Sequence, residues 1–176
     1  MIVFLFLACS ENRKKSNVFA EATSEKPMEN IDEDVIEGTI QSYNFSDFEQ
    51  EFLQQNDDQV YVINFWATWC KPCVKELPAF EQLHTAYEFK NVTVVLVSLD
   101  FPEKLQTRVI PFVAKYGLNS RVILLDDSDF NSWIPKVSEE WSGAIPATLM
   151  VKNGSQKFYE RSFTFEELEN ELKTIL

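Results

Sequence analysis

Two nearly continuous apolar runs, Val60 to Trp66 and Val92 to Leu99, stand in the middle of the chain. Both are rich in β-branched or aromatic residues, as expected of strands that are covered on both faces. Between them, residues from about Cys70 to Phe89 place apolar side chains at helical spacing, and Pro78 should bend that helix. Two strands that are joined through a helix predict a parallel, right-handed crossover.

Weaker patterns predict further elements on both sides of this unit. Before it, we expect a short strand near Val35 to Tyr43 and a helix that is capped by Ser46. After it, the apolar spacing predicts a helix from about Glu103 to Tyr116 that stops at Gly117, a strand over Val122 to Leu125, and a short helix from Phe130 to Trp141.

The last third of the chain has hairpin and capping signals. Ala147 to Val151 and Lys157 to Tyr159 flank an Asn-Gly pair, which favours the tight turn of an antiparallel hairpin. Thr164 and Glu167 form a capping box that begins a final helix. We therefore predict an α/β domain over residues 35–176, with a central mixed sheet flanked by helices.

The N-terminal 34 residues follow neither pattern. Met1 to Ala8 are mostly apolar and lead to Cys9, a run that is too short to cross a bilayer, so we interpret residues 1–9 as an export signal. Residues 10–34 are rich in Glu, Asp, Asn, Ser and Lys and have no regular period, which predicts a flexible acidic tether. A disordered leader without a function is the alternative.

Charge and cysteine content narrow the classes of partner. The chain has 16 basic and 28 acidic residues and a net charge of -12, which repels polyphosphates, so we expect no nucleic-acid partner. The three cysteines, Cys9, Cys70 and Cys73, are too few for a framework of structural disulfides. We expect them to be working groups.

Cys70 and Cys73 directly follow a predicted buried strand and begin a predicted helix. The free N–H groups and the positive dipole end of a helix N-terminus stabilise a thiolate. We predict that Cys70, as an exposed first-turn residue, attacks a substrate disulfide and that Cys73 resolves the mixed disulfide. Pro72 suits an early helix position, and Lys71 adds a positive charge whose effect is small if the side chain is exposed.

A zinc site is the structural alternative for the two cysteines. Zinc takes at least three protein ligands, and the remaining imidazole, His84, falls about 16 Å further along the same helix. We therefore expect neither a metal nor a cofactor, and we interpret His84 as an ordinary helix residue.

The run from Asn64 to Cys73, Asn-Phe-Trp-Ala-Thr-Trp-Cys-Lys-Pro-Cys, resembles the active-site strand and turn of the thioredoxin superfamily. Pro78 stands where that family has its helix-bending proline. Within the superfamily, the chain is similar to the TlpA/ResA-like thiol-disulfide reductases of bacterial envelopes. The resemblance covers roughly Val35 to Leu176, and it implies a thioredoxin fold with an extra N-terminal strand and helix.

The resemblance also implies an activity and its partners. The activity is reduction of disulfides in client proteins, and the electron donor is a membrane dithiol protein. Cytochrome c maturation or general disulfide repair is the implied pathway. Oxidation or isomerisation of disulfides stays open as an alternative, because proteins of this chemistry span a wide range of reduction potentials.

The segment from Ser142 to Thr148 resembles the part of thioredoxin-like proteins that carries a cis-proline facing the dithiol. This implies that Pro146 is cis and that the backbone of Ile145 faces the disulfide, where a substrate strand can pair with it. A trans proline that opens a strand is the alternative. The predicted substrate contacts are Trp69, Lys71, Pro72, Ile145 and Pro146.

Glu76 matches an acidic residue that TlpA/ResA-like proteins keep near their cysteines. Thioredoxins have a buried Asp at the position of Asn64, so their usual proton acceptor is missing there. The resemblance implies that Glu76 accepts the proton of Cys73, provided that burial raises its pKa towards neutrality. A solvated helix glutamate is the alternative.

The segment Leu7-Ala8-Cys9-Ser10 resembles a bacterial lipoprotein signal, although Phe6 stands where that signal usually has Leu. It implies lipid attachment at Cys9 and a location on the periplasmic side of the envelope, at a membrane surface. An incidental cysteine in an ordinary signal is the alternative.

Two other classes of function remain as hypotheses. A peroxidase of the peroxiredoxin type has a Pro and a Thr where this chain has Ile63 and Ala67. A non-catalytic metallochaperone or binding module needs a histidine that is placed near the cysteines, which His84 is not expected to supply.

Overall fold

The two apolar runs form neighbouring parallel strands, β2 (Val60–Trp66) and β3 (Val92–Ser98), in the middle of a sheet. Helix α2 (Lys71–Tyr87) connects them. The structure is a computed structural model that describes residues 40–55 and 57–176. The predictions for residues 1–9 and 10–34 and for the start of the first strand concern residues outside this part of the chain.

The described residues form one mixed sheet of six strands in the order β1-β4-β3-β2-β5-β6. Strands β1, β4, β3 and β2 are parallel. Strand β5 pairs with β2 in the antiparallel direction, and β6 pairs with β5 in the antiparallel direction, as the hairpin signal predicted. The remaining strands are β1 (Gln41–Tyr43), β4 (Arg121–Leu125), β5 (Ala147–Lys152) and β6 (Ser155–Tyr159).

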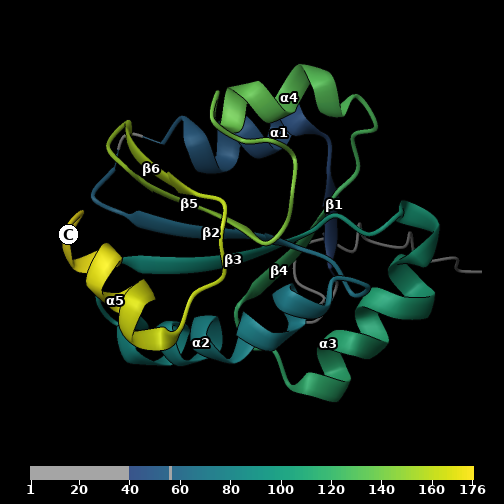
Figure 1. The fold of residues 1–176 in the computed structure, drawn as a ribbon, viewed down its shortest axis with the longest axis horizontal. Coiled ribbons are helices and arrows are strands. Elements are labelled where there is room, and N and C mark those ends of the chain that lie inside the picture. The colour runs from purple at the N-terminus through teal and green to yellow at the C-terminus, as the bar shows by residue number, and fades with distance from the viewer. Residues whose placement is uncertain (1–39, 56) are drawn as a thin grey trace, which may run out of the picture. The chain divides into compact units, whose positions relative to one another are not determined.

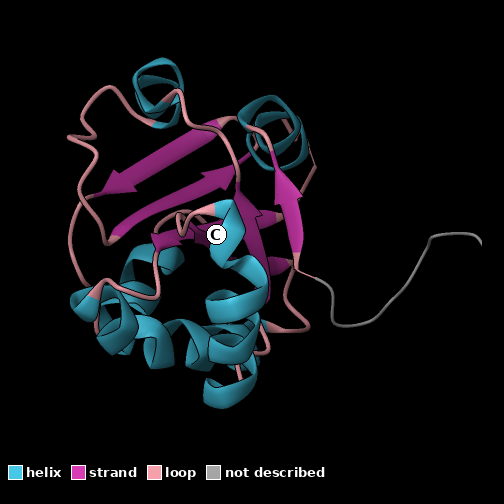
Figure 2. Cartoon of the chain, turned by 90° about the vertical axis from the view of Figure 1, so that its right-hand side faces the viewer, coloured by secondary structure: helices cyan, strands magenta, loops and turns pink. Residues whose placement is uncertain are grey.

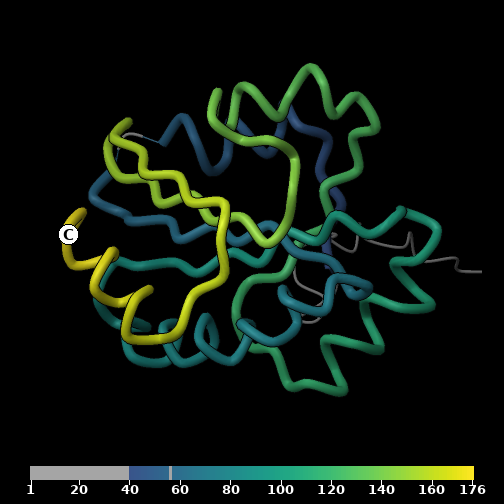
Figure 3. The backbone as a smooth tube through the Cα atoms, in the orientation of Figure 1, coloured from purple at the N-terminus to yellow at the C-terminus, as the bar shows by residue number. Residues whose placement is uncertain are grey.

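Helices cover both faces of the sheet (Figures 1 and 2). One face carries α2, α3 (Ile110–Tyr116) and α5 (Phe165–Lys173), and the other carries α1 (Phe45–Phe48) and α4 (Phe130–Val137). Figure 3 traces the chain from β6 into α5, which returns to lie beside α2. Among the described residues, no helix is long and apolar enough to span a membrane.

Alternating side chains of β2 divide the core into two parts, because successive residues of a strand point to opposite faces. Val62 and Trp66 pack with α2 and α5, whereas Ile63 and Phe65 pack with α1 and α4. Burial on both faces explains why this strand is a continuous apolar run with Asn64 as its one polar residue.

The helix before β2 begins differently from the prediction. The cap is Asn44, whose side chain accepts a hydrogen bond from the backbone N–H of Asp47 at 2.9 Å, so the expectation for Ser46 was wrong. The earlier start buries Phe45, which stacks on Trp133 of α4. After α1, the chain continues as a π-helix over Glu49–Leu53.

The predicted helix between β3 and β4 is composite. A 3-10 turn (Pro102–Lys104) and a π-helical segment (Leu105–Val109) precede α3. The predicted stop at Gly117 is confirmed, because this residue takes the left-handed conformation with φ of 60°. Helix α4 ends at Val137, short of the predicted Trp141, which lies in the loop that follows and is buried in the core.

The local signals of the last third are confirmed. Asn153 and Gly154 both have positive φ in the turn between β5 and β6. Thr164 and Glu167 form the predicted capping box at the start of α5.

Candidate active site

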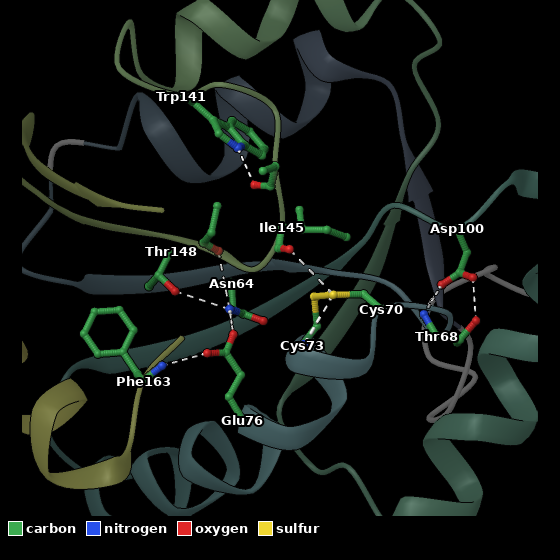
Figure 4. Close-up of a disulfide and its surroundings, with 12 residues drawn as sticks. Asn64, Thr68, Cys70, Cys73, Glu76, Asp100, Trp141, Ile145, Thr148 and Phe163 are labelled. Atoms are coloured by element: carbon green, nitrogen blue, oxygen red, sulfur yellow. Dashed lines mark hydrogen bonds between the residues drawn. A yellow bond between two sulfur atoms is a disulfide. The ribbon is translucent and has the colours of Figure 1, made fainter. Parts of the chain in front are cut away.

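Cys70 and Cys73 form a disulfide at the N-terminal end of α2 (Figure 4). Cys70 is the N-cap residue, and its sulfur accepts a hydrogen bond from the backbone N–H of Cys73 at 3.3 Å. The prediction of Cys70 as an exposed first-turn residue was wrong, because Cys70 precedes the first turn and is only 5% exposed, while Cys73 is fully buried. Cys70 is still the more exposed residue of the pair.

The loop before β5 approaches the disulfide from the opposite side. The Ile145-Pro146 peptide bond is cis, which confirms that prediction. The carbonyl oxygen of Ile145 lies 3.7 Å from the sulfur of Cys70. Pro146 is buried and Ile145 is half-buried, so Ile145 is the more accessible of these two residues next to the disulfide.

Glu76 lies one helical turn after Cys73 and is buried between α2, β2 and the segment before α5. The side-chain N–H of Asn64 donates to Oε1 at 2.9 Å, and the backbone N–H of Phe163 donates to Oε2 at 2.8 Å (Figure 4). Burial raises the pKa of Glu76 to about 7, although these two hydrogen bonds and the charge of Arg161 act in the opposite direction. The prediction that burial raises the pKa of Glu76 towards neutrality is confirmed, and the alternative of a solvated helix glutamate is wrong.

The turn that carries Cys70 is held by a buried carboxylate that sequence reasoning missed. Asp100 accepts hydrogen bonds from the backbone N–H of Thr68 at 2.8 Å, from its hydroxyl at 2.6 Å, and from the hydroxyl of Ser98 at 2.9 Å. The backbone N–H of Cys70 in turn donates to the carbonyl of Ala67 at 3.1 Å. The end of β3 therefore fixes the position of the turn after β2. An Asp that directly follows an apolar strand was the signal available in the sequence.

A groove of about 420 Å³ begins beside the disulfide. It is largely apolar and carries acidic side chains along part of its wall. Trp69, which directly precedes Cys70, is 58% exposed at this groove. The residues that line it include Trp69, Phe101, Phe130, Ile134, Ile145 and the acidic pair Asp126 and Asp127.

The other predicted contact residues lie at the surface of the helix start. Lys71 and Pro72 are exposed, so the effect of the Lys71 charge on the sulfur is screened by solvent. The described residues contain no cluster of three or more His, Cys, Asp or Glu side chains that could hold a metal ion. His84 is half-buried on α2, beyond the reach of the cysteines at the other end of the helix.

A disulfide of two closely spaced cysteines at a helix N-terminus, opposite a cis-proline and next to a buried acid, is typical of a thioredoxin-fold thiol-disulfide oxidoreductase, and this chain is one. Residues 34–155 match the AhpC/TSA family, and the chain belongs to that family.

The relatives of known name agree with this class. The chain is 29% identical over 176 residues to thiol-disulfide oxidoreductase ResA of Oceanobacillus iheyensis. This alignment covers 99% of the chain and 81% of the relative. The chain is 33% identical over 126 residues to the thioredoxin-like protein YneN of Bacillus subtilis, covering 70% of the chain and 69% of the relative.

Solved structures show the same fold. The crystal structure of StoA from Bacillus subtilis has 28% sequence identity and a TM-score of 0.53, covering 65% of this chain and 83% of that one. A thioredoxin-related protein from Neisseria meningitidis reaches a TM-score of 0.58 at 22% identity, covering 69% of this chain and 88% of that one.

Proposed function

We propose that this chain reduces disulfides of client proteins in the bacterial cell envelope, with Cys70 as the nucleophile and Cys73 as the resolving cysteine. The observation that carries the proposal is the arrangement at the start of α2. The more exposed sulfur caps the helix, and the buried sulfur lies one turn from a buried carboxyl group whose pKa is near neutrality.

In the first step, the thiolate of reduced Cys70 attacks one sulfur of the client disulfide. A bond forms between Cys70 and that sulfur, and the client's second sulfur leaves as a thiolate. The helix N-terminus stabilises the negative sulfur of Cys70 before attack, and the backbone N–H of Cys73, at 3.3 Å in the disulfide, is a donor to it.

In the second step, Cys73 attacks the sulfur of Cys70 and releases the reduced client. Cys73 must lose its proton for this attack, and it is fully buried away from water. Glu76 is the base in our proposal, because it lies one turn along the same helix and its pKa of about 7 lets it accept a proton at neutral pH.

The groove beside Trp69 favours a protein as the substrate rather than a small-molecule disulfide. An extended client segment can pair with the backbone of Ile145, and an apolar side chain next to the client cysteine can enter the groove. The acidic side chains of Asp126 and Asp127 in the wall favour a client that carries a basic residue near that cysteine.

The location and tether are part of the same proposal. We propose that residues 1–9 direct export, that lipid is attached at Cys9, and that residues 10–34 tether the domain of residues 35–176 to a membrane surface. Labelling with radioactive palmitate tests the anchor. The unsubstituted protein should incorporate the label, and Cys9→Ser should not. A membrane dithiol protein would return the disulfide to the dithiol, and cytochrome c maturation and general disulfide repair are the pathways that the resemblance implies.

Stoichiometric exchange tests the activity. The pre-reduced protein should convert to the Cys70–Cys73 disulfide while an oxidised client gains two thiols, and Cys70→Ser should be inactive. Equilibration with a glutathione buffer fixes the direction. A potential near that of thioredoxin supports reduction, whereas one near that of DsbA supports the alternative of an oxidase.

A further inference from the structure

Asn64 is a fully buried polar residue within the apolar strand β2. Its neighbours on the same face of the strand, Val62 and Trp66, pack in one core with Cys73. The amide group of Asn64 therefore lies in the layer between β2 and α2, which also holds Cys73. A buried amide is costly to a protein unless its polar atoms have hydrogen-bond partners.

The two ends of this amide differ in their partners. The nitrogen donates to Oε1 of Glu76 at 2.9 Å, to Oγ1 of Thr148 at 3.2 Å and to the carbonyl of Ala147 at 3.4 Å. Among the described residues, the oxygen Oδ1 has no partner, although it is buried. This orientation is favoured while Glu76 is charged, because a flipped amide would place its oxygen against the carboxylate and the carbonyl of Ala147.

The unpartnered oxygen points to the side of the amide on which the disulfide lies (Figure 4). In the disulfide, the sulfur of Cys73 carries no hydrogen and offers no donor. Reduction places one S–H group in this buried layer. We propose that Asn64 is a positioning residue for the second step, with Oδ1 accepting the S–H of reduced Cys73 while the amide nitrogen holds the carboxyl group of Glu76.

This inference rests on the proposed function and extends it to the group that orients the proton donor and the base. In the mixed disulfide, the S–H of Cys73 turns from Oδ1 to the carboxylate of Glu76, which takes its proton, and the sulfur of Cys73 forms a bond to Cys70. The bond between Cys70 and the client sulfur breaks, and its electron pair leaves with the client sulfur as a thiolate, which takes a proton from water. Glu76 later returns its proton to solvent, and the amide of Asn64 is unchanged.

Rapid acid quench separates the two steps in the full chain. The reduced protein is mixed with oxidised glutathione, and mass spectrometry measures the fractions of dithiol, mixed disulfide and Cys70–Cys73 disulfide over time. Asn64→Leu, which is similar in size and apolar, should slow the second step about tenfold, so that the mixed disulfide accumulates. The first step should stay within about twofold, because, in the part of the chain that the structure describes, no hydrogen bond joins Cys70 to the amide.

Thr148→Val is the matched control. It removes another partner of the same nitrogen in the same buried layer but leaves Oδ1 and the contact with Glu76 in place. Both steps should stay within about twofold in this variant. Thermal unfolding of each oxidised variant verifies the fold, and Asn64→Ala replaces Asn64→Leu if leucine prevents folding.

The pH profile of the second step supplies a readout that a purely structural role would not move. Asn64→Leu removes one N–H donor to Glu76, so the pKa of that carboxyl group rises further and the midpoint of the rate moves to higher pH. Arg161, which acts in the opposite direction, and Lys75 and Glu167, which line the same surface pocket as Glu76, are unchanged in both variants.

Three results decide between the proposals. A selective loss in the second step together with the pH shift supports the role of Asn64. Unchanged kinetics in Asn64→Leu, or an equal loss in both steps, overturns that role and leaves the proposed function intact. Absence of exchange in the unsubstituted protein overturns the proposed function itself.

Discussion

The backbone N–H of Phe163 donates to the carboxyl group of Glu76 at 2.8 Å, across 87 positions of sequence. This bond attaches the segment before α5 to α2 one turn from Cys73. Together with the bond from Asn64, it holds both oxygens of a carboxyl group that burial disfavours in its charged form. The hydrogen bonds fix the position of this carboxyl group, and burial sets its pKa near neutrality, as the proposed role of Glu76 as a base requires.

The first prediction concerns stability against pH. The pKa of Glu76 is raised from the ordinary 4.5 to about 7, so the folded protein keeps a proton that the unfolded chain has already lost. The contribution of this group is fully present below pH 4.5, and it falls by about 3 kcal/mol as the pH rises to about 7. Urea unfolding of the oxidised protein at pH 4, 5.5 and 7.5 should show this fall, and Glu76→Gln should remove it.

Comparison of Glu76→Gln with the unsubstituted protein isolates the contribution of the Glu76 carboxyl group. Glu167 and Glu169, whose pKa values are lowered by hydrogen bonds from Thr164 and Lys173, titrate in both and cancel in the difference. If the difference in the free energy of unfolding between Glu76→Gln and the unsubstituted protein is constant with pH, the carboxyl group is not perturbed as described.

The second prediction concerns the turn before Cys70. Asp100→Asn keeps the shape of the side chain but replaces a charged acceptor of three hydrogen bonds by a neutral one. We expect a loss of about 1 to 3 kcal/mol in the free energy of unfolding. The attack of Cys70 on oxidised glutathione should slow about tenfold, because Trp69 and Cys70 lose a fixed position.

The control for this turn is Thr68→Ser, which keeps both the hydroxyl and the backbone donor to Asp100. It should match the unsubstituted protein in stopped-flow rate and in urea unfolding. Equal behaviour of Asp100→Asn would show that the turn is positioned without the carboxylate.

The third prediction concerns client binding. Trp69→Ala removes an exposed wall of the groove, so kcat/KM for a protein client should fall about tenfold, while the rate with oxidised glutathione changes less than about twofold. Phe89→Ala is the control, because Phe89 is 93% exposed just after α2 and is not part of the groove. A parallel loss with both substrates would place Trp69 in the chemistry instead of in client binding.

The sequence predicts the centre of this fold well because burial on both faces leaves a continuous apolar pattern in β2 and β3. The hairpin and the start of α5 are also predictable, since each depends on residues that are close in the chain. The prediction of Ser46 as the cap of α1 was wrong because Asn44 and Ser46 are both residue types that cap helices well. The packing of Phe45 on α4 decides between them.

The site was only partly predictable for a similar reason. The cysteine motif is local, whereas Asp100 meets Thr68 across 32 positions and Asn64 meets Thr148 across 84. Only the folded sheet brings these groups together. The low exposure of Cys70 also follows from packing, because the loop of Ile145 covers it.

The central claim is that Cys70 is the sulfur that attacks the client. Locating the mixed disulfide that forms with a client tests this claim most directly. Reduced Cys73→Ser and reduced Cys70→Ser are each incubated with an oxidised client protein, and peptide mass spectrometry locates the mixed disulfide. The account predicts a stable client adduct on Cys70 in Cys73→Ser and little or none on Cys73 in Cys70→Ser. Equal trapping on both sulfurs, or trapping on Cys73 alone, would contradict the assignment of Cys70 as the attacking sulfur.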